Sequence, residues 1–258
     1  MPNLGARMKT VAILVAVSMT IFAAAPAAPN EGPKLVLTRL TDKLYVAEDF
    51  SFAKENSLVY IGNTYVTVIG ATWTPRTASR LAEEISGITS KPIGEVVNTN
   101  HDLDRAGGNA FFNSIGARIV STKMTRDLLE REGKRSVELM RLSYPDYPEV
   151  EIVLPDEYFP GDFALQDGDL RCIYLGPSHK PDDIFVNFPK EKVLYGGCIL
   201  KEELGSLDGA DLVEYPRTLM RLKELDLDID TIVAGHFTPV QGPELIDRYL
   251  RLLEQNRR

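Results

Sequence analysis

The sequence predicts an α/β fold in which strands and helices are mixed along the whole chain. Short runs rich in β-branched and aliphatic residues recur from residue 35 to residue 234, as expected of buried strands. Longer segments with a helical spacing of apolar residues lie between these runs. Both halves of the chain show the same order of elements. A group of strands comes first, and a mixture of helices and strands follows.

The first half begins with four strand-like runs and then alternates helices with strands. We expect a helix over Pro75–Ile85, because Thr74 is a suitable N-cap and proline is favoured at the first helical position. We expect a longer helix over Thr125–Leu142, which Pro145 then ends. The other expected elements are a helix over Gly107–Ile115 and strands over Leu35–Leu40, Leu44–Ala47, Asn56–Ile61, Tyr65–Gly70, Gly94–Asn98 and Arg118–Ser121.

The second half is expected to add a second group of strands and two helices. The helices are expected over Tyr215–Leu225 and Pro243–Leu253. No internal repeat and no low-complexity linker divides the chain. The expected strands are Glu151–Leu154, Phe163–Gln166, Leu170–Gly176, Asp183–Asn187, Val193–Gly197 and Thr231–Ala234.

Composition and charge indicate a globular protein and argue against some classes of partner. The apolar fraction of 44% is ordinary for a globular chain, and the formal charge at pH 7 is −8. An acidic balance without a basic cluster argues against nucleic acid or an anionic membrane as a partner. The charge does not identify the partner, and a monomer is our expectation without a residue pattern behind it.

The first 30 residues differ from the rest. Arg7 and Lys9 precede an uncharged run from Val11 to Ala25, and small residues follow. This pattern is typical of a secretory signal peptide. A transmembrane anchor is the alternative, but the run is shorter than the roughly 20 residues that span a bilayer. We therefore expect residues 1–27 to be a signal peptide for export to the periplasm, and residues 28–258 to form one domain.

The chain has two cysteines, Cys172 and Cys198. Export leads to an oxidising compartment, where a disulfide between them is one possibility. The alternative is a metal-bound thiolate, because coordination deprotonates the sulfur. Cys172 lies within a strand-like run and is expected to be a buried apolar residue. Cys198 lies at the end of another strand and is the candidate ligand.

The most informative segment is Asn98–Asn109, which follows an apolar strand-like run. Asn100, Asp102 and Asp104 are spaced two residues apart, so in extended backbone their side chains leave on one face. Three oxygen-bearing groups at a strand's end form a candidate cation site. A surface turn rich in Asp and Asn is the alternative interpretation.

The three histidines are His101, His179 and His236, and each lies outside the expected strands and helices. Loops at one edge of a sheet are where binding groups usually gather. Asp104, Cys198 and His236 would supply oxygen, sulfur and nitrogen, a three-ligand set that leaves a fourth position open, as in catalytic zinc sites. A thiolate disfavours magnesium and calcium. The pattern therefore predicts zinc.

Six segments of the chain, in this order along the sequence, resemble segments of a known protein family. They are Val66–Pro75, Asn98–Asn109, Gly176–His179, Leu194–Glu202, Gly235–His236 and Gly242–Asp247. The chain resembles the metallo-β-lactamases and, more narrowly, their mono-zinc, carbapenem-selective subclass. The resemblance implies a four-layer αβ/βα sandwich of two mixed sheets flanked by helices, with the metal at the edge that the sheets share.

The resemblance also implies roles for single residues. The family's zinc ligands fall on Asp104, Cys198 and His236, and the asparagine that opens the subclass motif N-x-H-x-D falls on Asn100. The second-site histidine falls on His179. The lysine that binds the substrate carboxylate falls on Lys201, and an ammonium near a metal cleft would pair with an anion. A solvated lysine is the alternative.

Two positions depart from the subclass. Asp102 stands where the motif has its histidine, while His101 occupies the preceding position and would point to the opposite face from Asn100. Asp102 could act as a general base, although the nearby Asp104 tends to raise a carboxyl pKa and zinc opposes that rise. Ser206 stands where the subclass usually has a substrate-contacting asparagine.

The resulting expectation is a secreted zinc hydrolase that opens the β-lactam ring, with carbapenems preferred. Lys201 would hold the substrate carboxylate, with Ser206 nearby, and Asp102 or Asp104 would activate the water. His179 and Asn100 would hydrogen-bond the oxyanion or the water. We expect one zinc ion per chain, with a second, weaker site as an alternative.

Two alternatives remain open at this point. One is a related zinc hydrolase of another ester, lactone or amide. The other is a protein that binds zinc or a β-lactam with little turnover because of Asp102. Trp73 is expected either at the floor of the pocket or in the core.

Overall fold

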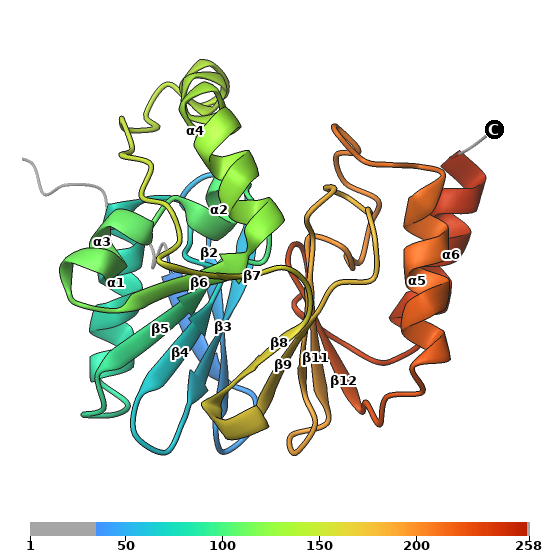
Figure 1. Cartoon of the computed structure of the whole chain (residues 1–258), viewed down its shortest axis with the longest axis horizontal. Coiled ribbons are helices and arrows are strands. Elements are labelled where there is room, and N and C mark those ends of the chain that lie inside the picture. The colour runs from blue at the N-terminus through green and yellow to red at the C-terminus, as the bar shows by residue number, and fades with distance from the viewer. Residues whose placement is uncertain (1–34, 257–258) are drawn as a thin grey trace, which may run out of the picture. The chain divides into compact units, whose positions relative to one another are not determined.

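The computed structural model describes residues 35–256, and within them the chain forms two mixed β-sheets (Figure 1). The first sheet has the strand order β1 to β7, with antiparallel pairing from β1 to β4 and parallel pairing from β4 to β7. Its strands are β1 Leu35–Arg39, β2 Leu44–Asp49, β3 Glu55–Ile61, β4 Val66–Ile69, β5 Ile93–Val97, β6 Arg118–Thr122 and β7 Glu157–Phe159.

The second sheet is formed by the second half of the chain, in the order β13-β12-β11-β10-β9-β8. Its only parallel pair among the described residues is β11 with β12, so the carboxyl ends of these two strands meet at one edge. The strands are β8 Phe163–Leu165, β9 Leu170–Ile173, β10 Phe185–Phe188, β11 Val193–Gly197, β12 Thr231–Ala234 and β13 Val240–Gln241.

Helices cover the outer faces of both sheets. In Figure 1, α1 (Pro75–Ser86) and α3 (Asn109–Ser114) lie against the first sheet, and α5 (Glu214–Glu224) and α6 (Leu245–Asn256) lie against the second. Each pair shares a buried apolar cluster with its sheet. The result is the four-layer αβ/βα sandwich that the sequence predicts. None of the helices in residues 35–256 has the length and apolar character needed to cross a bilayer.

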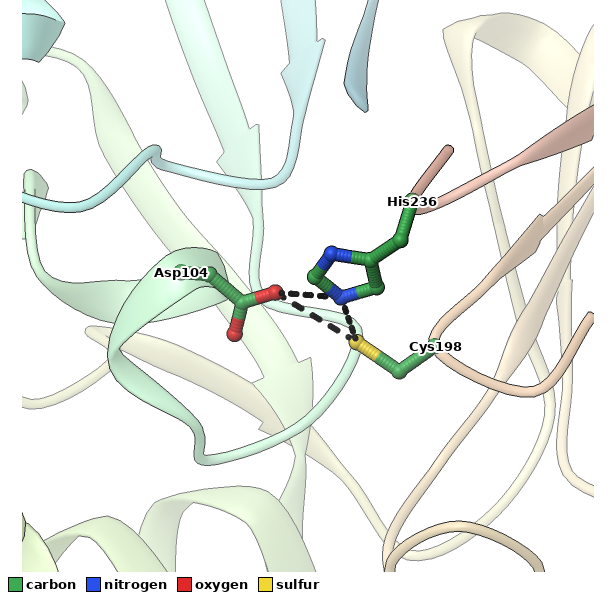
Figure 2. A group of neighbouring side chains, drawn as sticks. All are labelled: Asp104, Cys198 and His236. Carbon is green, nitrogen blue, oxygen red and sulfur yellow. Dashed lines mark hydrogen bonds and ion pairs between the residues drawn. The ribbon is translucent and has the colours of Figure 1, made fainter. Parts of the chain in front are cut away.

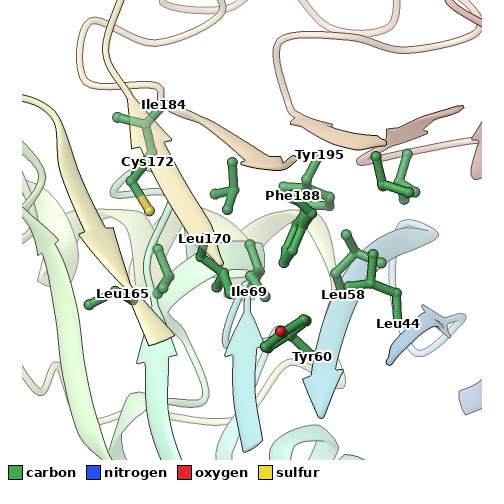
Figure 3. Close-up of a cluster of buried hydrophobic side chains, with 14 of the residues drawn as sticks. Leu44, Leu58, Tyr60, Ile69, Leu165, Leu170, Cys172, Ile184, Phe188 and Tyr195 are labelled. Atoms are coloured by element: carbon green, nitrogen blue, oxygen red, sulfur yellow. The ribbon is translucent and has the colours of Figure 1, made fainter. Parts of the chain in front are cut away.

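The two sheets face each other across a third apolar cluster (Figure 3). Leu58 and Ile69 of the first sheet pack there with Leu170 and Phe188 of the second. Cys172 belongs to this cluster and is 1% exposed. Both cysteines of the chain lie in its described part and are free thiols, so the alternative of a disulfide between them is excluded in this structure.

The helix boundaries follow the capping signals in the sequence. Thr74 Oγ1 accepts the backbone N–H of Thr77, and the Thr77 side chain accepts the N–H of Thr74, which forms a reciprocal cap for α1. The long helix α4 (Lys123–Ser143) begins after Thr122, whose side chain accepts the N–H of Thr125. Both predicted helices are therefore confirmed, with small shifts at their ends.

Two sequence-based expectations are wrong. Residues 151–154 are not a strand, and the strand that pairs with β6 begins later, at Glu157. Asp104 does not lie in extended backbone, because Leu103–Ala106 forms the short helix α2. The predicted helix over Gly107–Ile115 begins two residues later, at Asn109. The predicted signal peptide, residues 1–27, lies outside the described residues.

Candidate metal centre

Three potential metal ligands from distant parts of the chain meet at the shared edge of the sheets (Figure 2). Asp104 comes from α2, Cys198 directly follows β11, and His236 lies just after β12. Cys198 Sγ lies 3.5 Å from Asp104 Oδ2 and 3.7 Å from His236 Nε2, and the last two atoms are 3.2 Å apart. One oxygen, one sulfur and one nitrogen thus converge within the reach of a single ion.

Two glycines let the loops that carry these ligands come close together. Gly197 has a φ of +50°, a left-handed conformation that turns the chain directly after β11 and before Cys198. A Cβ at Gly235 would lie 2.4 Å from the backbone of Gly197. The parallel pairing of β11 and β12 therefore continues into a tight contact that places Cys198 beside His236.

The buried guanidinium of Arg105 connects the ligands to both sheets. Its Nε donates to Cys198 Sγ at 3.2 Å, and one Nη lies 2.9 Å from Asp104 Oδ2. Its other Nη donates to the buried carboxylate of Glu55 at 2.7 Å. A further bond reaches the carbonyl oxygen of Gly235. Sequence analysis missed Arg105, although it directly follows Asp104 and is one of the few charged residues with no exposed surface.

The hydrogen bonds of His236 determine its tautomer. Its Nδ1 lies 2.8 Å from the backbone carbonyl oxygen of Lys54. A carbonyl only accepts, so Nδ1 carries the proton and Nε2 presents its lone pair toward Asp104 and Cys198. This is the arrangement that metal-bound imidazoles adopt, with the second nitrogen held by a protein acceptor.

The electrostatics of the cluster favour a bound cation. Burial alone would raise the pKa of Asp104, but the Arg105 guanidinium opposes it, and that pKa is held well below its usual range. Burial raises the pKa of the Cys198 thiol, and Arg105 opposes this rise. A metal deprotonates a coordinating thiol outright. The donor set of carboxylate, sulfur and imidazole fits zinc and leaves one side open for a further ligand.

The three ligands line one side of a cavity of about 530 Å³. Trp73 also lines this cavity while it packs with Leu103 and Tyr147, so both expectations for its position are met. Helix α4 supplies an apolar wall through Leu139 and Met140. Other residues around the cavity are Asp102, His179, Lys180, Lys201, Ser206, Asp208 and Phe237.

Lys201 brings an ammonium group to the cavity. The residue is only 2% exposed, and its Nζ has one hydrogen bond to protein within residues 35–256, a 3.5 Å contact to the carbonyl oxygen of Ser206. Burial lowers the pKa of Lys201, against the opposing charges of Cys198, Asp183 and Asp104. The alternative of a solvated lysine is therefore wrong. Ser206 lines the cavity at the same place.

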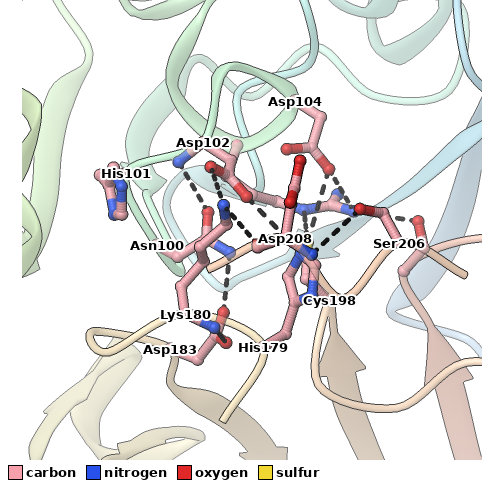
Figure 4. Close-up of polar contacts among 12 residues, drawn as sticks. Asn100, His101, Asp102, Asp104, His179, Lys180, Asp183, Cys198, Ser206 and Asp208 are labelled. Carbon is pink, nitrogen blue, oxygen red and sulfur yellow. Dashed lines mark hydrogen bonds and ion pairs between the residues drawn. The ribbon is translucent and has the colours of Figure 1, made fainter. Parts of the chain in front are cut away.

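Asn100 is not among the residues that line the cavity, and His101 points away from it, as the sequence predicted for His101. Asn100 is fully buried, its Nδ2 donates to Asp183 Oδ1 at 2.7 Å, and its Oδ1 accepts the N–H of Asp102 at 2.9 Å. Its amide thus connects Asp183 with the backbone of Asp102, and the expected contact of Asn100 with substrate or water stays a prediction. His101 points away and bonds Asp182 at 2.8 Å (Figure 4).

Asp102 lines the cavity beside His179 and forms an ion pair that the sequence analysis did not anticipate. Its Oδ1 lies 3.3 Å from Lys180 Nζ, and its Oδ2 lies 3.7 Å from His179 Nε2 (Figure 4). Burial and the nearby Asp104 raise the pKa of Asp102, while Lys180 opposes the rise. The position of Lys180 directly after His179 is the signal that could have revealed this pair.

Comparisons with known proteins show which proteins this chain resembles. A sequence model described as the Metallo-beta-lactamase superfamily matches residues 52–236. The chain is 27% identical over 216 residues to "Metallo-beta-lactamase type 2" of Elizabethkingia meningoseptica, covering 80% of each chain. It is 24% identical over 260 residues to "Metallo-beta-lactamase type 2" of Bacteroides fragilis, covering 96% of this chain and 97% of that one.

Solved structures support the fold. The crystal structure of the DIM-1 metallo-beta-lactamase superposes with a TM-score of 0.75 at 20% identity, covering 87% of this chain and 99% of the other. The TMB-1 structure gives a TM-score of 0.76 at 21% identity, covering 88% of this chain and all of the other. Together with the sheet topology, these matches confirm the predicted fold class.

Proposed function

Because the chain belongs to the metallo-beta-lactamase superfamily, we propose that it is a zinc-dependent hydrolase that opens the β-lactam ring, with carbapenems preferred. The observation that carries the proposal is the convergence of Asp104, Cys198 and His236 on one side of a cavity that also contains the buried Lys201 ammonium. One zinc ion on these three ligands is proposed. Zinc would supply charge stabilisation for the ring nitrogen as its bond to carbon breaks.

Other residues that line the cavity would bind the substrate and stabilise the charge that develops on it. Lys201 would pair with the substrate carboxylate, since its ammonium is desolvated and makes only one long contact within the described residues. His179 is neutral, because burial and the Lys201 and Lys180 ammoniums lower its pKa. A neutral imidazole Nε2 that carries the proton could donate to the developing oxyanion of the opened carbonyl.

Of the two carboxylates expected to activate water, Asp102 is the better placed. Asp104 Oδ2 is surrounded by Arg105, Cys198 and His236, and is needed as a ligand. Asp102 pairs with Lys180 through Oδ1, which leaves Oδ2 beside His179 as a proton acceptor. In this scheme Asp102 takes one proton from water and the hydroxide oxygen bonds to the ring carbonyl carbon. As the carbon–nitrogen bond breaks, the proton held by Asp102 passes to the leaving ring nitrogen, which restores the carboxylate.

Carbapenem preference, export to the periplasm and a monomeric state are parts of the same proposal. The subclass resemblance of the Asn98–Asn109 segment supports the preference, and the pattern of residues 1–27 supports export. The rival activity is hydrolysis of another ester, lactone or amide at the same zinc. The rival without catalysis is a protein that binds zinc or a β-lactam but turns over neither.

The test is hydrolysis of imipenem by the purified, zinc-loaded protein, with benzylpenicillin and a lactone as comparison substrates. We expect imipenem to be hydrolysed fastest, activity to disappear with a chelator, and added zinc to restore it. Faster lactone hydrolysis would support the rival hydrolase. A protein that holds zinc but turns over none of the three would support the binding protein and refute the proposal.

The variant Asp102→His tests the departure from the subclass motif separately. Its carbapenem turnover should fall if Asp102 is the proton acceptor in this chain. A higher turnover would show that the aspartate is a handicap, and would remove Asp102 from the scheme without removing the zinc site.

A further inference from the structure

A second pair of ligand-type atoms lies outside the Asp104–Cys198–His236 cluster. Asp102 Oδ2 and His179 Nε2 are 3.7 Å apart, and both residues line the cavity (Figure 4). A carboxylate oxygen and an imidazole nitrogen are both zinc ligands, and this separation is one that two ligands of the same ion can have. The pair therefore marks a place where a second divalent cation could bind.

A positive charge already lies at this place. Lys180 Nζ is 3.3 Å from Asp102 Oδ1 and donates to the carbonyl oxygen of Asp208 at 3.2 Å. The backbone N–H of Lys180 donates to the buried Asp183 carboxylate at 2.5 Å, which fixes the start of the side chain. The ammonium is thus held between two loops, and the side chain is only 18% exposed.

A divalent ion would have to compete with this ion pair, in which Lys180 Nζ lies 3.3 Å from Asp102 Oδ1. A divalent ion at Asp102 and His179 would lie beside this ammonium and be repelled by it. To relieve this repulsion Lys180 would have to leave the carboxylate, and a largely buried charge would then lack its partner, which is costly.

We propose that the Lys180 ammonium is the second cation of this site, in the place where a second metal ion would otherwise bind. It neutralises Asp102, keeps a divalent ion away from Asp102 and His179, and makes the chain a one-zinc protein. Lys180 is a positioning residue in this role, because it fixes the Asp102 carboxylate through Oδ1. The inference rests on the proposed zinc site at Asp104, Cys198 and His236.

The test counts metal ions in full-length protein and needs no activity measurement. Wild type, Lys180→Met and Lys180→Arg are dialysed against buffered zinc over a range of free concentrations, and bound zinc is measured by mass spectrometry. Lys54→Met is the matched control, because Lys54 lines the same cavity but pairs with Glu48 instead of Asp102. Circular dichroism and thermal unfolding check that each variant folds.

We expect one zinc ion in wild type, in Lys54→Met and in Lys180→Arg, which keeps the positive charge. Lys180→Met should bind a second ion, roughly ten- to a thousandfold more tightly than any second ion on wild type, the range in which a neighbouring unit charge changes an ionic equilibrium. The double variant Lys180→Met with Asp102→Asn should return to one ion. This loss would place the second ion at Asp102.

Two results would overturn the inference: two tightly bound ions in wild type, or a single ion in folded Lys180→Met. Replacing zinc by cobalt shows whether a negative result concerns this inference or the proposed function. A thiolate-to-cobalt absorption band reports the Cys198 site alone. If wild type lacks this band, the zinc site and the inference both fail. If the band is present but Lys180→Met holds only one ion, the inference fails and the proposed function stands.

Discussion

The two cysteines show how differently the interior and the edge of this molecule treat the same side chain. Cys172 is buried between the sheets among leucine, isoleucine and phenylalanine, and burial raises the pKa of its thiol. Cys198 is equally buried, but it touches Arg105 and lies beside Asp104 and His236. Burial alone makes a thiol inert, whereas burial next to a guanidinium and two further ligands prepares it for a metal.

Replacing each cysteine by serine is the strongest test of this difference, and the larger effect is expected at Cys198. Cys198→Ser removes the only sulfur ligand, so zinc affinity should fall and hydrolysis should drop by at least about a hundredfold, since metal stabilisation of charge amounts to several kcal/mol. Zinc content after dialysis and imipenem turnover are the measurements. Unchanged zinc binding in Cys198→Ser would remove Cys198 from the proposed ligand set.

Arg105 is the residue that makes the two environments different. Arg105→Met should lower zinc affinity by roughly ten- to a hundredfold, as expected when a group that orients metal ligands is lost. It should also lower the free energy of unfolding by about 1–3 kcal/mol, because Glu55, whose pKa burial raises to about 8 even beside Arg105, would lose its buried hydrogen-bond donor. Zinc competition with a chelator and chemical denaturation measure the two effects. The double variant with Glu55→Met should recover part of the stability, because both polar partners are then gone, but it should not recover zinc affinity.

Lys201 extends the comparison to the substrate side of the cavity. Lys201→Met should raise the KM for imipenem by roughly ten- to a hundredfold, because a hydrogen bond to a charged group contributes about 1.5–3 kcal/mol. Zinc content should not change, since Lys201 is not among the ligands. Lys54→Met, on the same cavity but paired with Glu48, is the control. Equal KM values in the two variants would assign the substrate carboxylate to another residue.

The fold was largely predictable because its signals are local. The cap at Thr74 and the alternating strands and helices depend on neighbouring residues, and both agree with the structure. The expected strand at residues 151–154 failed because an apolar run does not reveal whether a partner strand is within reach. The four-layer arrangement came from the family resemblance, since pairing between distant strands leaves no local trace.

The site was predictable where residue type alone defines the chemistry. Asp104, Cys198 and His236 were named from their types and their places at the ends of elements, and the structure brings them together. Arg105 and Lys180 were missed because their importance depends on which distant carboxylates they meet in the fold. Asn100 was assigned to the substrate, but its partner Asp183 lies 83 residues away and no local pattern predicts that bond.

Cys172→Ser is the substitution with the smallest expected effect. It tests whether the core between the sheets is independent of the metal centre at the edge. A serine hydroxyl at this position would be buried among apolar side chains without a partner, which costs about 1–3 kcal/mol. The free energy of unfolding should fall by that amount, while zinc content and imipenem kinetics of the folded protein stay at wild-type values. Cys172→Ala separates the lost volume from the added hydroxyl, and should be the milder change. If Cys172→Ser also lowered zinc affinity, the core between the sheets would be coupled to the metal centre, and the contrast between the two thiols would no longer hold.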